Sequence, residues 1–137
     1  MRVVVDLNVI LDVLLTRHDS LECAEVLSLA RSSVIDAILP AHALPTIYYI
    51  SRKQLSDADV RRELRAILNM VTVASISQDA LRRALDSSLS DFEDAIVLET
   101  AKEMNAEAII TRNVNDFAKS PIPAVTARSF MEGIFRL

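Results

Sequence analysis

Residues 2–12 read R-V-V-V-D-L-N-V-I-L-D, and this stretch decides the fold. Val3 to Val5 is a β-branched run without polar alternation, which is typical of a short parallel strand buried on both faces. Asp6 closes the run, and Asn8 and Asp12 interrupt the apolar segment that follows. The chain therefore begins with a predicted buried strand whose carboxyl end carries polar side chains.

Four more short apolar runs have the same character, and helical patterns separate them. We predict the other strands at residues 35–39, 71–75, 108–111 and 124–126. We predict that Ser20 and Asp57 cap helices and that two more helices begin at Ser77 and Ser90. Two others are predicted from about Ala41 to Lys53 and from Arg128 to Phe135. Strands that alternate with helices imply parallel pairing with right-handed crossovers. The sequence thus indicates one domain over residues 1–137, an α/β/α sandwich with three layers around a five-stranded parallel sheet.

Composition indicates where this protein is located and which kinds of partner it can have. The 137 residues are 51% hydrophobic and 25% charged, and no run approaches the roughly 18 apolar residues that a membrane span needs. We therefore expect a cytoplasmic protein with no membrane partner. The net charge of −4 means that a nucleic acid would have to be held by local cations. The single cysteine, Cys23, lies in an apolar helical pattern and is predicted to be a small core residue.

Acidic residues recur where predicted elements begin. In S-D-F-E-D-A (residues 90–95), Asp91 and Asp94 are three apart and share one face of a first helical turn, from which Glu93 points away. T-R-N-V-N-D-F (residues 111–117) follows the fourth strand and contains Asp116. Each acid alone has a structural explanation: Asp6 as a helix cap at about even odds, Asp91 as a partner of the helix dipole, Asp116 as part of a turn.

Three acids at three element starts are harder to explain as three independent caps. The carboxyl ends of parallel strands lie at one edge of a sheet, where ligands bind in α/β folds. Carboxylates without His or Cys partners suit Mg²⁺ or Mn²⁺. Such a site is suited to phosphodiester hydrolysis, so Asp6, Asp94 and Asp116 are predicted to hold a divalent metal.

D-L-N-V-I-L-D, D-F-E-D-A and T-R-N-V-N-D-F, in this order, resemble the PIN-domain family, including the VapC-type toxins. The resemblance spans nearly the whole chain and implies the strand order 3-2-1-4-5, which places Asp6 and Asp116 together. It also implies metal-dependent cleavage of single-stranded RNA, frequently by homodimers that pair with an antitoxin. Its acids match Asp6, Asp94 and Asp116, and its supporting polar positions match Asn8, Thr111 and Asn113.

One position departs from the family pattern. The second acid, usually a Glu before an apolar-aromatic stretch, falls at Thr46, which precedes Ile47-Tyr48-Tyr49. Activity is then weakened, uses Asp91 as a replacement, or is lost. The alternative to a ribonuclease is accordingly an inactive PIN fold that binds RNA or a protein partner.

Cations and aromatics add further expectations. Arg112 and Lys119 flank the third acidic cluster and are the candidates for holding RNA phosphates. His42 is expected to be structural, Tyr48 and Tyr49 are expected to pack, and the arginines of residues 57–68 are expected to lie on a solvated helix face. The apolar content of so small a domain predicts a homodimer.

Overall fold

The sheet has the expected strand order. The computed structural model describes residues 1–135, and its five strands pair in parallel in the order β3-β2-β1-β4-β5. The strands are β1 (Arg2–Val5), β2 (Asp36–Pro40), β3 (Thr72–Ala74), β4 (Ala108–Ile110) and β5 (Ala124–Val125). The pairing of β1 with β4 places Val5 beside Ile110, so Asp6 and Thr111 leave the sheet side by side.

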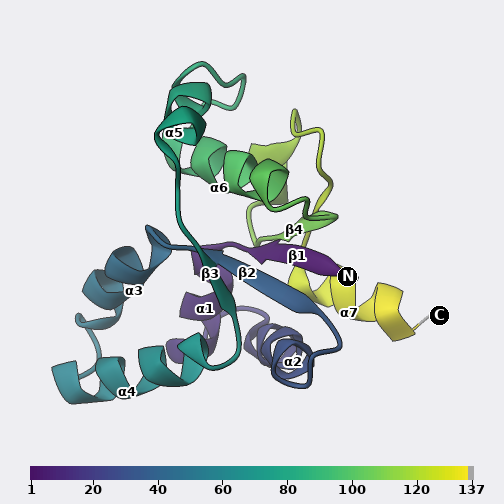
Figure 1. Cartoon of the computed structure of the whole chain (residues 1–137). Coiled ribbons are helices and arrows are strands. Elements are labelled where there is room, and N and C mark those ends of the chain that lie inside the picture. The colour runs from purple at the N-terminus through teal and green to yellow at the C-terminus, as the bar shows by residue number, and fades with distance from the viewer. Residues whose placement is uncertain (136–137) are drawn as a thin grey trace.

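Helices cover both faces of this sheet (Figure 1). The helices α5 (Gln78–Leu85) and α6 (Phe92–Glu103) lie on one face, above the sheet in the figure. The other face carries α1 (Leu7–Leu14), α2 (Ser20–Arg31), α3 (Ala43–Ser51), α4 (Asp57–Leu68) and α7 (Ala127–Phe135). The predicted three-layer α/β/α sandwich is confirmed. No helix within residues 1–135 is long and apolar enough to cross a membrane.

The position of β1 between two apolar cores explains why its sequence lacks polar alternation. Val3 and Val5 pack into the core under α1 and α2, whereas Val4 packs into the core under α6, and all three are fully buried. Each residue of β1 therefore meets an apolar layer, whichever face it points to. Cys23 lies in the first of these cores, where burial raises the pKa of its thiol to about 12.

Several element starts differ from the predictions by one residue. Asp19, Ser56 and Asp91 occupy the N-cap positions of α2, α4 and α6, where the sequence favoured their neighbours, while Ser77 caps α5 as expected. Residues 114–117, expected as a loop, form the short 3₁₀ helix η1 (Val114–Phe117). Leu21 of α2 and Leu85 of α5 are exposed.

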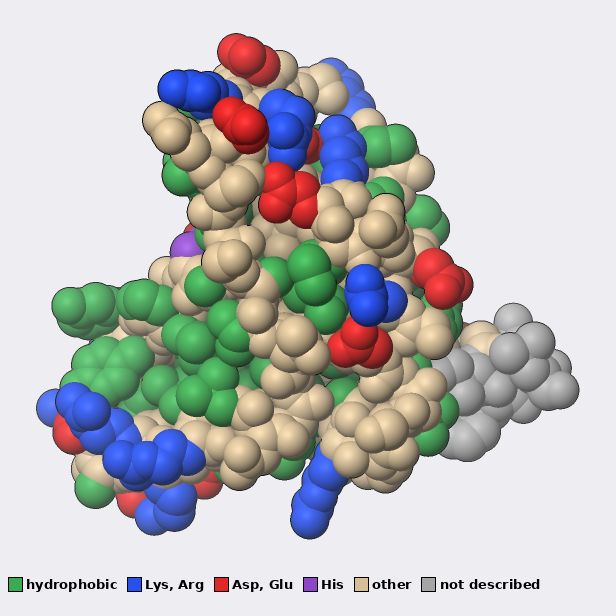
Figure 2. All heavy atoms as spheres, in the orientation of Figure 1, with side chains coloured by type: hydrophobic (Ala, Val, Ile, Leu, Met, Phe, Trp, Pro, Cys, Tyr) green, Lys and Arg blue, Asp and Glu red, His purple; other side chains and the backbone are tan. Residues whose placement is uncertain are grey.

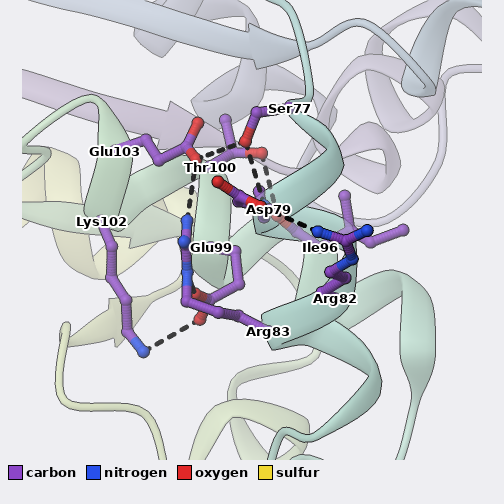
Figure 3. A network of polar contacts seen from close by, with 10 residues as sticks. Ser77, Asp79, Arg82, Arg83, Ile96, Glu99, Thr100, Lys102 and Glu103 are labelled. Atoms are coloured by element: carbon purple, nitrogen blue, oxygen red, sulfur yellow. Dashed lines mark hydrogen bonds and ion pairs between the residues drawn. The ribbon is translucent and has the colours of Figure 1, made fainter.

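A charged network fixes α5 to α6 (Figure 3). Glu99 of α6 is only 2% exposed, and its carboxylate accepts from Arg83 Nε at 2.8 Å and pairs with Lys102 Nζ at 2.9 Å. Arg83 Nη2 also reaches Glu103 at 2.8 Å. Burial would raise the pKa of Glu99, but Lys102 and Arg83 outweigh it and keep that pKa below its ordinary value. The network joins α5 to the helix whose first turn contains Asp94.

Replacing Arg83 with Met is expected to lower the free energy of unfolding by about 1 kcal/mol, because Glu99 keeps Lys102 as a partner while Arg83 itself is half exposed. Urea unfolding at pH 7 measures this change. The matched control is Arg82→Met, whose partner Asp79 is exposed, and it should change stability by less than about 0.5 kcal/mol. Equal effects of the two substitutions would contradict the importance of the buried carboxylate.

Candidate functional site

Asp6 is held in one orientation at the carboxyl end of β1. Its side chain is 3% exposed, and its Oδ1 accepts from the Leu7 backbone N–H at 2.8 Å as the cap of α1. Its Oδ2 accepts from the Thr111 hydroxyl at 2.8 Å and from Asn8 Nδ2 at 3.1 Å. Asp6 can therefore cap α1 through Oδ1 and also serve as a site residue.

The supporting polar residues surround this carboxylate. Asn8 and Thr111 are both buried, and the Thr111 hydroxyl accepts from the Asn113 backbone N–H at 3.1 Å. Asn8 Oδ1 accepts from the Arg112 backbone N–H at 3.1 Å. The chain segments after β1 and β4 are therefore joined by side chains, as well as by the sheet.

The start of α6 supplies further acids. Asp91 caps the helix, and its Oδ1 accepts from the Asp94 backbone N–H at 2.9 Å. Asp94 and Glu93 are half-buried, whereas Asp91 is exposed. Burial is the largest cause that raises the pKa of Glu93, and the charges of Asp6 and Asp91 add to that effect.

The acids crowd one another around Asp94. Burial, followed in order of size by the charges of Asp91, Asp6, Asp116 and Glu93, raises the pKa of Asp94 to about 7. The pKa of Asp6 is likewise raised, by burial first and by the charge of Asp91, against the hydrogen bonds from Thr111, Leu7 and Asn8. The largest causes of both shifts are thus burial and neighbouring carboxylates, with hydrogen bonds opposing the shift at Asp6.

A hard divalent cation fits this donor set. Within residues 1–135, no three carboxylate, imidazole or thiol groups are close enough to hold one ion together. Mg²⁺ does not require such a closed set, because it keeps several waters and is bound in proteins through one or two carboxylates. The acids therefore suit a hydrated metal that would relieve their repulsion, with Asp6 as the best-oriented oxygen donor.

Replacing Asp94 with Asn is expected to stabilise the metal-free protein. Its folded pKa of about 7 lies above the ordinary 3.8, so the folded state binds a proton that the unfolded chain releases. Ionised Asp94 therefore destabilises the fold above pH 7, and this cost disappears as the pH falls from 7 towards 4. After allowance for solvent screening, we expect a gain of roughly 1–2 kcal/mol at pH 8 that shrinks at pH 5.

Urea unfolding in EDTA at both pH values measures this gain. Asp86→Asn, an exposed acid in the C-cap position of α5, is the control and should show no such pH dependence. A gain for Asp94→Asn that is equal at pH 8 and pH 5 would contradict the crowding of charge around this residue.

The remaining site candidates lie after β4. Asp116 is exposed in η1, and its charge reaches Asp94. Lys119 is exposed and takes part in no ion pair among the residues that the structure describes. Arg112, expected to face phosphate, instead directs its Nη1 to Asp12 on α1 at 2.8 Å.

The place of the missing acid offers no carboxylate. Thr46 lies in α3, and its hydroxyl donates to the His42 carbonyl at 3.4 Å. Burial lowers the pKa of His42, so its ring is neutral at neutral pH. Glu93 is the acid that sequence reasoning set aside, and the D-F-E-D spacing alone could not show that the charge of Asp6 raises its pKa.

Comparison with known proteins agrees with this architecture. A chain of VapBC2 from Rickettsia felis, solved bound to a promoter DNA fragment, aligns with a TM-score of 0.69 and 16% identity over 92% of this chain and 98% of that chain. A chain of a toxin-antitoxin complex from Klebsiella pneumoniae aligns with a TM-score of 0.68 and 24% identity over 91% and 97%. A search of curated proteins gives no match. The family model of the PIN domain matches residues 2–115, and the chain belongs to the PIN-domain family.

Proposed function

We propose that this protein is a divalent-metal-dependent endoribonuclease that cleaves single-stranded RNA and acts as the toxin of a VapBC-type toxin–antitoxin pair. The observation that carries the proposal is the crowding of the charges of Asp91, Asp6, Asp116 and Glu93 around Asp94. Family membership and the likeness to two toxin–antitoxin structures support it. Perturbed acids at the carboxyl edge of a parallel sheet are typical of functional sites.

Asp6, Asp94 and Asp116 would hold hydrated Mg²⁺ or Mn²⁺, with one or two of these acids bound directly and the others through the waters of the ion. Asp91 and Glu93 would supply the negative charge that the family places at the position of Thr46. When bound, the ion activates water for attack on phosphorus and neutralises charge on the phosphate oxygens. Asp6 keeps its orientation through the donors of Leu7, Asn8 and Thr111. The acids act as metal ligands in this scheme and form no covalent bond to RNA.

RNA is held by local cations, because the chain has a net charge of −4. Lys119 is the exposed cation nearest in sequence to Asp116, and we assign it a contact with a substrate phosphate. Arg112 reaches phosphate only if its contact with Asp12 leaves another guanidinium nitrogen available. Replacing Lys119 would therefore weaken RNA binding more than it slows cleavage.

The test of the proposal is incubation of the purified protein with a panel of single-stranded and structured RNAs in Mg²⁺, in Mn²⁺ and in EDTA. Cleavage of single-stranded members with metal alone is the expected result. Cleavage of duplex RNA in preference, or equal cleavage in EDTA, would contradict the proposed substrate or the proposed metal.

The second candidate function is an inactive PIN fold that binds RNA or protein. Thr46 in place of an acid favours it, as does the absence of a closed carboxylate trio within residues 1–135. Under this alternative, RNA binding survives EDTA and no metal produces cleavage.

We also propose that two copies associate. Hydrophobic side chains gather over α3 and α4 in Figure 2, beside the basic side chains of α4. Tyr49 is 72% exposed, contrary to its expected packing, and Leu68 is 46% exposed. Large apolar surfaces of this kind mark protein interfaces more often than solvent-facing helices.

Light scattering at micromolar concentration should give twice the mass of one chain. Tyr49→Ser should shift the mass towards that of one chain, whereas Leu21→Ser, which removes an exposed leucine of α2, should leave it unchanged. A single-chain mass for the wild type would contradict the dimer.

A further inference from the structure

Asp12 is a buried acid that the proposed metal chemistry does not use. It lies on α1, one turn after Asn8, and is only 2% exposed. Its Oδ1 accepts from Arg112 Nη1 at 2.8 Å and lies 3.5 Å from Arg17 Nε. A buried carboxylate requires a partner of opposite charge. Arg112, which lies 100 residues later in the chain, is that partner.

Arg112 also reaches the site through its backbone. Its N–H donates to Asn8 Oδ1 at 3.1 Å, which fixes the orientation of the Asn8 carboxamide. Because the oxygen of that carboxamide accepts from Arg112, its Nδ2 faces Asp6 Oδ2, at 3.1 Å. One continuous series of contacts thus runs from Asp12 through Arg112 and Asn8 to Asp6.

The same residue anchors the segment that bears the third acid. Arg112 lies between Thr111, whose hydroxyl donates to Asp6 at 2.8 Å, and η1, which contains Asp116. Releasing the Arg112 side chain from α1 would loosen this segment where it leaves the sheet. Two site acids would then lose their fixed relation to each other.

We propose that Asp12 and Arg112 form a positioning pair, which acts through Asn8 and the segment of residues 111–117 to orient Asp6 and Asp116. The role of this pair in catalysis rests on the proposed nuclease function, whereas its effect on the orientation of Asn8 does not depend on that function. This assignment differs from phosphate binding by Arg112: a positioning residue changes kcat, while a phosphate ligand changes KM and the dependence of binding on salt.

The decisive variant is Asp12→Asn combined with Arg112→Gln, because it removes both charges of the pair together. Arg17 then loses its contact with Asp12, but its side chain is 35% exposed. We expect kcat to fall 10–100-fold, as for the loss of contacts that orient metal ligands, with KM within about twofold of the wild type. Adding Asn8→Ala to this variant should produce little further loss, because the two changes interrupt one series of contacts. Arg128→Gln, which removes an exposed cation paired with Asp19, is the control and should leave kcat unchanged.

A second readout does not depend on activity. The Asn8 side-chain amide should give a resolved NMR signal with slow hydrogen exchange in the wild type, and this protection should be lost in the Asp12→Asn, Arg112→Gln variant. Retained protection, or a change in KM alone, would overturn the positioning pair. If the wild type cleaves no RNA while the amide behaves as expected, the nuclease proposal fails and the positioning pair stands.

Discussion

Asp6→Asn abolishes metal-dependent RNA cleavage, with an expected loss in kcat of at least about 100-fold. Asparagine has the size of aspartate, so the side chain remains in its 3%-exposed position. Its amide nitrogen, however, must face a donor, because Leu7, Asn8 and Thr111 all donate hydrogen bonds to the present carboxylate. The variant therefore loses both a charge and an oxygen ligand, and changes to residues that merely orient metal ligands already cost 10–100-fold.

The control is Asp86→Asn, which changes net charge equally at an exposed position. Stabilisation by Mn²⁺ in thermal unfolding gives an independent readout, since a ligand that binds only the folded state raises its stability. Wild type and Asp86→Asn should be stabilised by Mn²⁺, and Asp6→Asn should respond much less. A variant at position 6 that cleaves at the rate of the wild type would remove Asp6 from the site.

Arg112→Met lowers the free energy of unfolding by about 2–4 kcal/mol. The substitution leaves Asp12 2% exposed with only the more distant Arg17 as partner, and removing one member of a buried pair typically costs about 3–5 kcal/mol. We expect the lower part of that range because Arg112 itself is 33% exposed. Burial already raises the pKa of Asp12, against the charges of Arg112, Arg17 and His18.

Without Arg112 the pKa of Asp12 rises further above its ordinary value, so the folded variant holds a proton at a pH where the unfolded chain has already released it. The loss should accordingly be larger at pH 8 than at pH 5. Urea unfolding at the two pH values measures it, with Arg128→Met as the control for an exposed pair that contributes at most about 1 kcal/mol. Equal losses for the two variants would show that burial of Asp12 has no energetic consequence.

The sheet was predictable because its strands are apolar on both faces. Val3, Val4 and Val5 meet two different cores, and a run that satisfies both cannot alternate. Strand order followed only from the resemblance, since periodicity does not say which strands are neighbours. The one-residue shifts at Asp19, Ser56 and Asp91 arise because adjacent polar residues can all cap a helix, and the turn before it selects one.

The site was predictable in part, for a comparable reason. Parallel strands 1 and 4 bring Asp6 and Thr111 together, so their proximity followed once the order was known. Glu93 was set aside because helical spacing gives relative directions along α6, but not how the helix is rotated above the sheet. The pairing of Arg112 with Asp12 was not predictable, because nothing local links residues 100 positions apart.

The most direct test of the central claim is the rate of cleavage of one susceptible RNA measured from EDTA through increasing Mn²⁺. A hydrated ion held by Asp6, Asp94 and Asp116 predicts no cleavage in EDTA, a rate that rises to saturation with Mn²⁺, and a flat response in Asp6→Asn. A wild-type rate that EDTA leaves unchanged would contradict the account.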